Sequence, residues 1–465
     1  MRPLWTVAEV VAATGGRPEG LLEGPIGSIS IDSRDIQPDA LFVAIEGDTH
    51  DGHDFVGKAL EQGAAAALVS EAFHARNGGS KLIVVADPLA ALTKLAVAAR
   101  ARSQAQIVAV TGSAGKTTTK EAMLTVFAAV GETHASVKSF NNHWGVPLTL
   151  ARLPREARFG VFEIGMNHAG EITPLVKLVR PHISVITTVA AAHLEFFASV
   201  ADIAMAKAEI FLGLEPGGTA VLNGDHEYLH ILFGRAREAG VSRIVTYGFD
   251  ESCDWRITGY EARGGRRHLS VVHDGQVHEL SLQVQGKHMA ANAVAALVVA
   301  SLAGEGPSTA AAALAGFGAP EGRGESARLG PADRPLLLVD ESYNANVASM
   351  TAALEVFAGV SAPGGRKVLV LGDMLELGPL GPELHASLKD AVLKSGADRI
   401  YLVGRAIDAL GKALGEGFVT AQTASIDEIA EAILSSLAHG DAVMVKGSNG
   451  VRLSSLVKLI RERFA

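Results

Sequence analysis

The stretch VTGSAGKTTTKE at residues 110–121 has the residue types of a loop that binds the phosphates of a nucleotide. It follows an apolar run and precedes a helical pattern, and at a helix N-terminus the free backbone N–H groups and the helix dipole favour anions. Gly112 and Gly115 would let the backbone approach phosphate oxygens. Lys116 would reach the β- and γ-phosphates, and the Thr117 hydroxyl would coordinate Mg²⁺.

The glycine spacing of this loop departs from the usual phosphate-loop motif. That motif has another glycine five residues before the glycine of the GK pair, and Val110 stands there instead. The plain alternative is a glycine-containing turn between a strand and a helix. The GKT sequence with two further threonines favours nucleotide binding but does not identify the reaction.

Two other strand-like runs place polar residues at their ends. RFGVFEIG (158–165) carries Glu163 inside an apolar run, where a carboxylate is costly unless it is paired or bound to a metal. HISVITTV (182–189) is followed closely by His193. Because ligands of open α/β sheets bind outside the carboxyl ends of the strands, Thr117, Glu163 and His193 are expected to share one Mg²⁺–ATP crevice. Taken singly, Glu163 could pair with a lysine and His193 could cap a helix.

Lys207 lies in IAMAKAEIF, on a predicted helix after His193. Lysines on helices are usually solvated, so this residue carries no functional meaning without further context.

Composition and charge limit the class of protein. Of 465 residues, 48% are hydrophobic and 20% are charged, and the length indicates about three domains. The net charge of −9 provides no basic field for nucleic acid or an anionic membrane, so neither is expected as a partner. The one cysteine, Cys253, excludes an intramolecular disulfide, and no apolar run reaches the length of a membrane span. We expect a cytoplasmic protein without a secretory signal.

The apolar runs predict an α/β protein with parallel sheets. Short β-like runs between residues 25 and 82 predict a small α/β domain, with strands in LFVAI (41–45), AAALVS (65–70) and KLIVVA (81–86). A central block has strands in AQIVAVTG (105–112), RFGVFEIG and HISVITTV, and a helix over residues 116–131. A third block alternates helical stretches with PLLLVDES (335–342), KVLVLGD (367–373), RIYLVG (399–404) and DAVMVKG (441–447), which predicts a doubly wound, Rossmann-like domain.

The spacing of the GK loop, Glu163, His193 and Lys207 resembles that of the Mur ligases, the ATP-dependent amide-forming enzymes of peptidoglycan synthesis. Five further blocks are similar to the members that use D-alanyl-D-alanine: DSRDIQPDALFVAIEGDTHDGHDF (32–55), FNNHWGVPLTL (140–150), EIGMNHAGEI (163–172), DESYNANVASM (340–350) and LGDMLELG (371–378). The resemblance implies a UDP-sugar-binding domain over residues 1–83, an ATP-binding domain over 84–321 and a Rossmann-like domain over 322–465.

The resemblance also implies roles for individual residues. The phosphate loop would hold ATP through Gly112, Ser113, Ala114, Gly115, Lys116, Thr117 and Thr118. Asn292, Arg323 and Glu341 match further nucleotide-binding positions. Two Mg²⁺ ions would be held, one by Thr117 and Glu163 and a second by Glu163, His193 and Lys207. Lys207 matches the lysine that in this family is modified by CO₂ to a carbamate, which would turn a cation into an anionic ligand. Lys116, His193 and Lys207 are therefore the expected catalytic residues.

The substrate positions follow from the same resemblance. Ser33 and Arg34 match the uridine nucleotide site, Asn141 and Asn142 match a stretch close to the reacting carboxylate, and Asn344 and Asn346 match positions near ATP or the incoming dipeptide.

Four positions or segments depart from the family pattern. Glu341 replaces an aspartate, Val347 a proline, Lys138-Ser139 a glycine-containing approach to the asparagine loop, and LEFF (194–197) a smaller loop after His193. None removes a chemical group, but the last could reshape the rim of the site.

The resemblance therefore implies an ATP-dependent ligase, expected to be a monomer, that joins D-alanyl-D-alanine to UDP-N-acetylmuramoyl-tripeptide through an acyl phosphate. Two alternatives stay open. Another amide ligase of the superfamily, such as a folylpolyglutamate synthetase, would share the central signals but not the other blocks. A phosphate-loop switch or kinase would have the usual glycine spacing and no use for His193 or Lys207.

Overall fold

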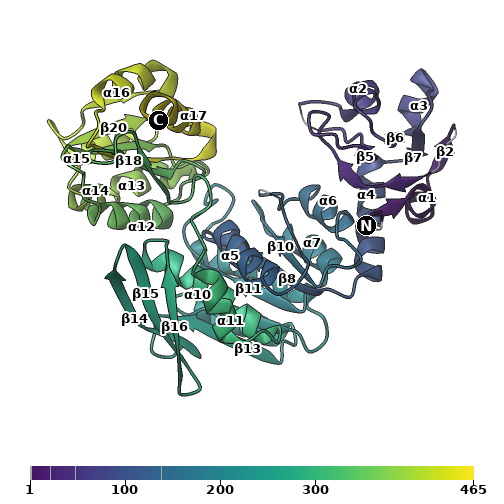
Figure 1. The fold of residues 1–465 in the computed structure, drawn as a ribbon, viewed down its shortest axis with the longest axis horizontal. Coiled ribbons are helices and arrows are strands. Elements are labelled where there is room, and N and C mark those ends of the chain that lie inside the picture. Colours follow the sequence, from purple (N-terminus) through teal and green to yellow (C-terminus); the bar gives the residue numbers. More distant parts are fainter. Residues whose placement is uncertain (1–2, 21, 23, 48, 138) are drawn as a thin grey trace.

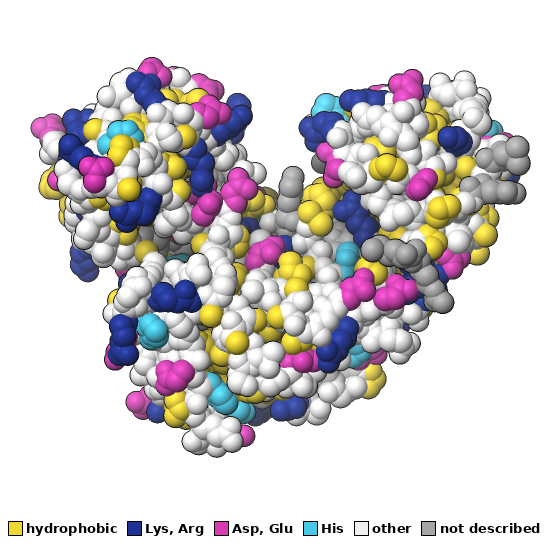
Figure 2. All heavy atoms as spheres, in the orientation of Figure 1, with side chains coloured by type: hydrophobic (Ala, Val, Ile, Leu, Met, Phe, Trp, Pro, Cys, Tyr) yellow, Lys and Arg dark blue, Asp and Glu magenta, His cyan; other side chains and the backbone are white. Residues whose placement is uncertain are grey.

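The computed structural model of the chain describes residues 3–20, 22, 24–47, 49–137 and 139–465. Three larger sheets follow one another along the sequence, and each forms a domain with its own helices (Figure 1). The N-terminal and C-terminal domains stand as two arms on the same side of the central domain, and Figure 2 shows an open notch between them. The predicted class, α/β with parallel sheets, is confirmed.

The N-terminal domain is built on a five-stranded sheet of order β2-β7-β6-β5-β4, in which only β2 is antiparallel to its neighbour. Its strands are β2 (Arg17–Glu19), β4 (Ser28–Ser30), β5 (Ala40–Val43), β6 (Ala66–Ser70) and β7 (Leu82–Val85), with a separate pair β1 (Trp5–Thr6) and β3 (Pro25–Ile26). Its helices are α1 (Val7–Thr14), α2 (Val56–Glu61) and α3 (Glu71–Asn77). The three predicted strands are present.

Helix α4 (Pro88–Arg102) joins the N-terminal and central domains. Leu95 packs in the N-terminal core, whereas Ala96, one residue on, packs in a central core. Trp5 strengthens this junction, because its indole N–H donates to the Ala151 carbonyl at 2.9 Å and the Arg102 guanidinium lies 3.5 Å above its ring. The division at residues 83 and 321 stays a prediction, and β7 itself extends past residue 83 to Val85.

The central domain has a nine-stranded sheet of order β16-β15-β14-β13-β12-β11-β8-β10-β9. Its parallel part contains β8 (Gln106–Thr111), β9 (Thr133–Ala135), β10 (Phe159–Glu163), β11 (Ile183–Ile186), β12 (Thr219–Asn223) and β13 (Arg243–Gly248). Helices α5 (Lys116–Ala128), α10 (Lys287–Leu302) and α11 (Pro307–Leu314) cover one face. Helices α6 (Gly145–Ala151), α7 (Ile172–Val179), α8 (Val200–Ala208) and α9 (Leu229–Glu238) cover the other.

An antiparallel extension of this sheet was not expected from the sequence. It comprises β14 (Trp255–Arg263), β15 (Arg266–His273) and β16 (Gln276–Leu282). The two turns, Gly264-Gly265 and Asp274-Gly275, have positive φ at both residues, which suits the right-handed twist of two-residue hairpins. The pairs GG and DG, placed between runs in which apolar and polar residues alternate, are a signal for hairpins. Such strands lack the continuous apolar runs that predicted the parallel sheets.

The C-terminal domain is doubly wound, as predicted. Its sheet has the order β17-β18-β22-β19-β20-β21 and is parallel except for β17. The strands are β17 (Glu325–Leu329), β18 (Leu336–Glu341), β19 (Lys367–Gly372), β20 (Arg399–Val403), β21 (Ala421–Thr423) and β22 (Ala442–Lys446). Separate apolar cores cover its faces, one with α12 (Val347–Ala358), α13 (Gly381–Ala386), α14 (Lys389–Lys394) and α15 (Asp408–Leu414), the other with α16 (Ala430–Ser436) and α17 (Ser454–Phe464).

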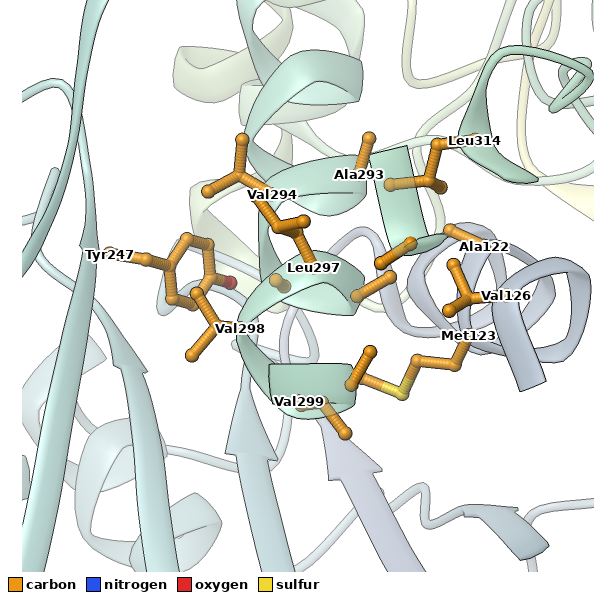
Figure 3. Packing of buried hydrophobic residues seen from close by; sticks show 14 of the residues in the cluster. Ala122, Met123, Val126, Tyr247, Ala293, Val294, Leu297, Val298, Val299 and Leu314 are labelled. Carbon is orange, nitrogen blue, oxygen red and sulfur yellow. The ribbon is translucent and has the colours of Figure 1, made fainter. Parts of the chain in front are cut away.

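Within the described part of the chain, no helix is long and apolar enough to cross a membrane. The long, Ala- and Val-rich helix α10 is buried in the central domain, where Leu297 and Val298 lie between Tyr247 of β13 and Met123 and Val126 of α5 (Figure 3).

The packing of α10 gives a test of the central core. Leu297→Ala removes a fully buried side chain and should lower the free energy of unfolding by about 2–5 kcal/mol, because a cavity adds to the lost burial. Val277→Ala is the control, since Val277 is exposed and its loss should cost under about 0.5 kcal/mol. Denaturation followed by tryptophan fluorescence reports on this core through Trp255. Equal midpoints for the two variants would contradict this packing.

Candidate active site

The phosphate loop occupies the short connection between β8 and α5. Gly112 has φ of 155° and an added Cβ would lie 1.9 Å from the Thr187 hydroxyl, so the close approach excludes a side chain. Gly115 has φ of 83° and precedes the helix without a side-chain cap, so the first N–H groups of α5 have no capping side chain. Val110 lies inside β8, opposite Glu163 of β10. The loop is therefore shorter than the usual motif, as its glycine spacing predicts.

Lys116, the first residue of α5, points back into this loop. Its amine donates to the Gly112 carbonyl at 2.7 Å. Burial lowers the pKa of Lys116, while the negative charge of Glu163 opposes that shift. A half-buried amine at the uncapped start of a helix is suited to binding a phosphate.

Glu163 ends β10 and is 1% exposed. One carboxylate oxygen accepts from the Thr117 hydroxyl and the other from the Asn141 amide, both at 2.8 Å. Among the described residues, Glu163 forms no ion pair, so the alternative that it pairs with a lysine is wrong. A buried carboxylate with only neutral donors, beside a threonine hydroxyl, is an oxygen donor set that suits Mg²⁺.

His193 follows β11 and adopts a left-handed backbone with φ of 58°. Its Nδ1 lies 2.5 Å from a carboxylate oxygen of Glu376 in the C-terminal domain. The hydrogen bond from His193 lowers the pKa of Glu376, although burial acts in the opposite direction. Ser199, not His193, caps the following helix α8, so the capping alternative is wrong.

Lys207 on α8 is 2% exposed, so it is not solvated as most lysines on helices are. Burial lowers its pKa well below the usual range, and the charge of Lys116 lowers it further. No hydrogen bond or ion pair joins its amine to any other described residue. The structure therefore favours a neutral amine, which is the form that reacts with CO₂.

One cavity of about 1200 Å³ brings most of the expected residues together, between the central and C-terminal domains. Its lining includes the following predicted residues: Ser113, Ala114, Gly115, Lys116, Thr117, Thr118, Asn141, Glu163, His193, Asn292, Arg323, Glu341, Asn344 and Asn346. The cavity volume is sufficient for a nucleotide together with a second substrate.

The C-terminal domain contributes its strand-end residues to this cavity. Asn346 caps α12 and its amide also donates to the Ser113 carbonyl of the phosphate loop at 3.1 Å. The guanidinium of Arg323 lies 4.1 Å from the centre of the Tyr343 ring. Glu341 accepts from Lys446 at 3.1 Å, and the same amine donates to the Asn344 carbonyl.

Five predicted residues do not line the cavity. Gly112 and Lys207 are linked to the lining residue Lys116: the Gly112 carbonyl accepts a hydrogen bond from the Lys116 amine, and the charge of Lys116 lowers the pKa of Lys207. Asn142 instead accepts from the Gly145 N–H at 2.9 Å. Ser33 and Arg34 belong to the N-terminal domain, where Ser33 is buried and Arg34 is exposed and paired with Asp32. The departure noted at Lys138 falls outside the described residues.

Several lining residues were not anticipated. Asn223 ends β12 and Asp225 follows it, His288 is the second residue of α10, and Lys446 ends β22. Burial lowers the pKa of His288, with Glu341 opposing. The sequence holds a signal for two of these positions: the polar segments NGD (223–225) and KGS (446–448) come at the carboxyl ends of strands, where ligands of open α/β sheets bind. Glu376 lies in LGDMLELG (371–378), but a glutamate in a loop does not by itself predict that its partner is His193.

Histidine, cysteine and acidic side chains do not form a metal-binding group of three or more anywhere in the described part of the chain. The set expected for Mg²⁺ has only two such residues, Glu163 and His193, and depends otherwise on Thr117 and a modified Lys207. Hydroxyl, carboxylate and carbamate oxygens with added phosphate and water oxygens suit this ion better than a closed cage of acidic side chains.

Comparisons with known proteins match nearly the whole length of the chain. Three family models match it: the Mur ligase family, catalytic domain, over residues 25–120; the Mur ligase middle domain over 110–300; and the Mur ligase, glutamate ligase domain, over 322–449. The UDP-N-acetylmuramoyl-tripeptide–D-alanyl-D-alanine ligase of Escherichia coli is 34% identical over 98% of each chain. Its counterpart in Rickettsia prowazekii is 30% identical over 92% of this chain and 94% of that one. A crystal structure of MurF from Acinetobacter baumannii matches 98% of this chain and 99% of that chain, with 28% identity and a TM-score of 0.84.

The buried carboxylate gives a direct test of this site. Glu163→Gln keeps the size of the side chain but removes its charge, so Mg²⁺ should no longer tighten the binding of ADP. Losing one such charged ligand should weaken binding of Mg²⁺–ADP by about 2–3 kcal/mol, or roughly 30- to 150-fold. Titration calorimetry with Mg²⁺ and with a chelator measures the difference. The control is Glu416→Gln, an exposed carboxylate that forms no hydrogen bond or ion pair with a described residue. A variant that keeps the full Mg²⁺ effect would exclude Glu163 as a ligand.

Proposed function

Because this chain belongs to the Mur ligase family, we propose that it joins D-alanyl-D-alanine to UDP-N-acetylmuramoyl-tripeptide in an ATP-dependent step of peptidoglycan synthesis. The observation that carries the proposal is the 34% identity to a ligase of that name over 98% of both chains. The cavity supports it, since the phosphate loop, a buried carboxylate and the strand ends of a second domain meet there.

The reaction needs activation of a carboxylate, which is a poor electrophile. The terminal carboxylate of the tripeptide attacks the γ-phosphorus of ATP, so a new P–O bond forms, ADP leaves and an acyl phosphate results. The amine of the dipeptide then attacks the carbonyl carbon and loses a proton. The tetrahedral intermediate collapses by breaking the C–O bond to phosphate, and the amide remains.

The residues of the phosphate loop position the nucleotide for this transfer. The N–H groups at the start of α5 and the Lys116 amine would bind the phosphate oxygens, and Asn292 and Arg323 would contact the remainder of the nucleotide. Thr117 and Glu163 would hold one Mg²⁺, and Glu163, His193 and carbamylated Lys207 a second. When bound, these ions neutralise the charge of the phosphates and of the approaching carboxylate.

The surroundings of Lys207 support its proposed modification. A neutral amine that captures CO₂ becomes a carbamate and releases one proton. The buried, neutral side chain of Lys207 would thereby become an anion. That anion would be stabilised by nearby Lys116, whose charge now opposes the protonation of Lys207.

The second substrate site is proposed for the C-terminal domain. Asn344 and Asn346 line the cavity from the C-terminal domain. Asn141 lines it from the central domain, where its amide donates to the Glu163 carboxylate, and we propose that it lies close to the reacting carboxylate of the tripeptide. Ser33 and Arg34 are proposed to contact the uridine nucleotide from the N-terminal domain. We further propose a monomer that acts in the cytoplasm, where its substrate ATP is supplied.

The proposed function has a simple test. Phosphate release from Mg²⁺–ATP should require both the UDP-muramoyl-tripeptide and D-alanyl-D-alanine, and mass spectrometry should find the ligated pentapeptide. Release that ignores the dipeptide would indicate a phosphate-loop switch or kinase. Release that appears only with a folate and glutamate would indicate the folylpolyglutamate alternative.

The carbamate proposal is tested by substitution and by removal of CO₂. Lys207→Ala should lower kcat about 10²- to 10³-fold, because a ligand of the charge-neutralising ions is lost. Wild-type activity should fall in CO₂-free buffer and return with bicarbonate, and ¹³CO₂ should give a carbamate signal in the NMR spectrum. The control is Lys177→Ala, an exposed lysine on α7. Full activity of Lys207→Ala would exclude the carbamate role.

A further inference from the structure

Two loops meet where the central and C-terminal domains face each other. One, residues 193–197, follows β11, and the other, residues 373–378, follows β19. Besides the contact between His193 and Glu376, the Glu195 N–H donates to the Glu376 carbonyl at 3.1 Å. An added Cβ on Gly378 would lie 3.1 Å from the Glu195 Cα, so the two backbones are in close contact. We call these contacts the interdomain clasp.

The clasp holds two residues in an unusual backbone conformation. His193 has φ of 58° and Glu376 has φ of 62°, in the left-handed region that side chains other than glycine rarely adopt. Such conformations persist where surrounding contacts fix them, and they are concentrated at sites with a functional constraint. For both residues, contacts from the opposite domain are among those that hold this conformation.

The chemistry of the pair assigns the proton on the histidine ring. A carboxylate only accepts hydrogen bonds, so Nδ1 of His193 must donate to Glu376. The other nitrogen, Nε2, then remains as the position at which the ring can act. Nε2 has no hydrogen-bond partner among the described residues, and His193 lines the cavity together with Glu163. A carboxylate that accepts from the far nitrogen of a ligand histidine fixes both its tautomer and its orientation.

The position of Glu376 makes this orientation depend on the arrangement of the domains. The histidine comes from the central domain and its carboxylate partner from the C-terminal domain. At another part of the cavity, Asn346 of the C-terminal domain contacts the Ser113 carbonyl of the phosphate loop. Glu376 and Asn346 of the C-terminal domain therefore contact His193 and Ser113, two residues of the central domain that are expected to act on the nucleotide.

We propose that Glu376 is a positioning residue: through the interdomain clasp it orients His193 for phosphoryl transfer only when the C-terminal domain covers the cavity. The kinetic part of this inference rests on the proposed function, but the effect on domain arrangement does not. Since half-exposed ion pairs add little to stability, loss of the clasp should change the domain arrangement and turnover without unfolding the protein.

The domain arrangement can be measured without substrate. Spin labels at Val277→Cys in β16 and Leu459→Cys in α17 report the distance between the two domains, and both sites are exposed whereas Cys253 is buried. Glu376→Ala should broaden the distance distribution and shift it to longer values. Glu376→Gln, which keeps an acceptor oxygen in place, should stay closer to wild type. Glu383→Gln is the control, because the exposed side chain of this α13 residue forms no hydrogen bond or ion pair with a described residue, and its change should have no effect.

Turnover provides the second measurement. Glu376→Ala should lower kcat about 10- to 100-fold with little change in KM for ATP, and Glu376→Gln should recover part of the loss. An unchanged distance distribution, or a kcat equal to that of Glu383→Gln, would overturn the proposal. If the wild-type protein forms no pentapeptide, the proposed function fails, and the spin-label distances still decide whether Glu376 holds the domains together.

Discussion

The candidate site depends on a negative charge that is buried at the end of β10. Glu163 is 1% exposed and its two oxygens are held by Thr117 and Asn141, which are neutral donors. A buried carboxylate in this state is stable only if a cation completes its surroundings. The parallel register of β8 and β10 places that charge beside the phosphate loop, so a cation bound to Glu163 would also meet the phosphates.

Two lysines, the half-buried Lys116 and the buried Lys207, lie at the same site. Lys116 and Lys207 are close enough to lower the pKa of Lys207, and no carboxylate in the described part of the chain forms an ion pair with either. The Lys116 amine is therefore open to an anion from outside the polypeptide, which in the proposed reaction is a phosphate of ATP. The neutral Lys207 amine would instead react with CO₂ and itself become an anionic carbamate. Charged groups without ion-pair partners are typical of a site that is completed by its ligands.

Much of the fold and of the cavity could be predicted from the sequence. The predicted strands are present because their continuous apolar runs are buried on both faces of parallel sheets, and the phosphate loop, Glu163 and His193 meet because parallel strands end at one edge. The hairpins of β14–β16 were missed because their strands are half exposed and lack such runs. The burial of Lys207 and the partner of His193 could not be predicted either. Both depend on contacts between segments far apart in the sequence, and in the case of Glu376 on how two domains are placed.

The central claim is that the γ-phosphoryl group of ATP passes to the carboxylate of the tripeptide, and isotope transfer tests this most directly. The tripeptide carries ¹⁸O in its terminal carboxylate, and the phosphate formed with ATP and D-alanyl-D-alanine is analysed by mass spectrometry. An acyl phosphate intermediate predicts one ¹⁸O atom in each phosphate, because the carboxylate oxygen leaves bonded to phosphorus. Phosphate without ¹⁸O, formed while the amide bond is made, would contradict the account.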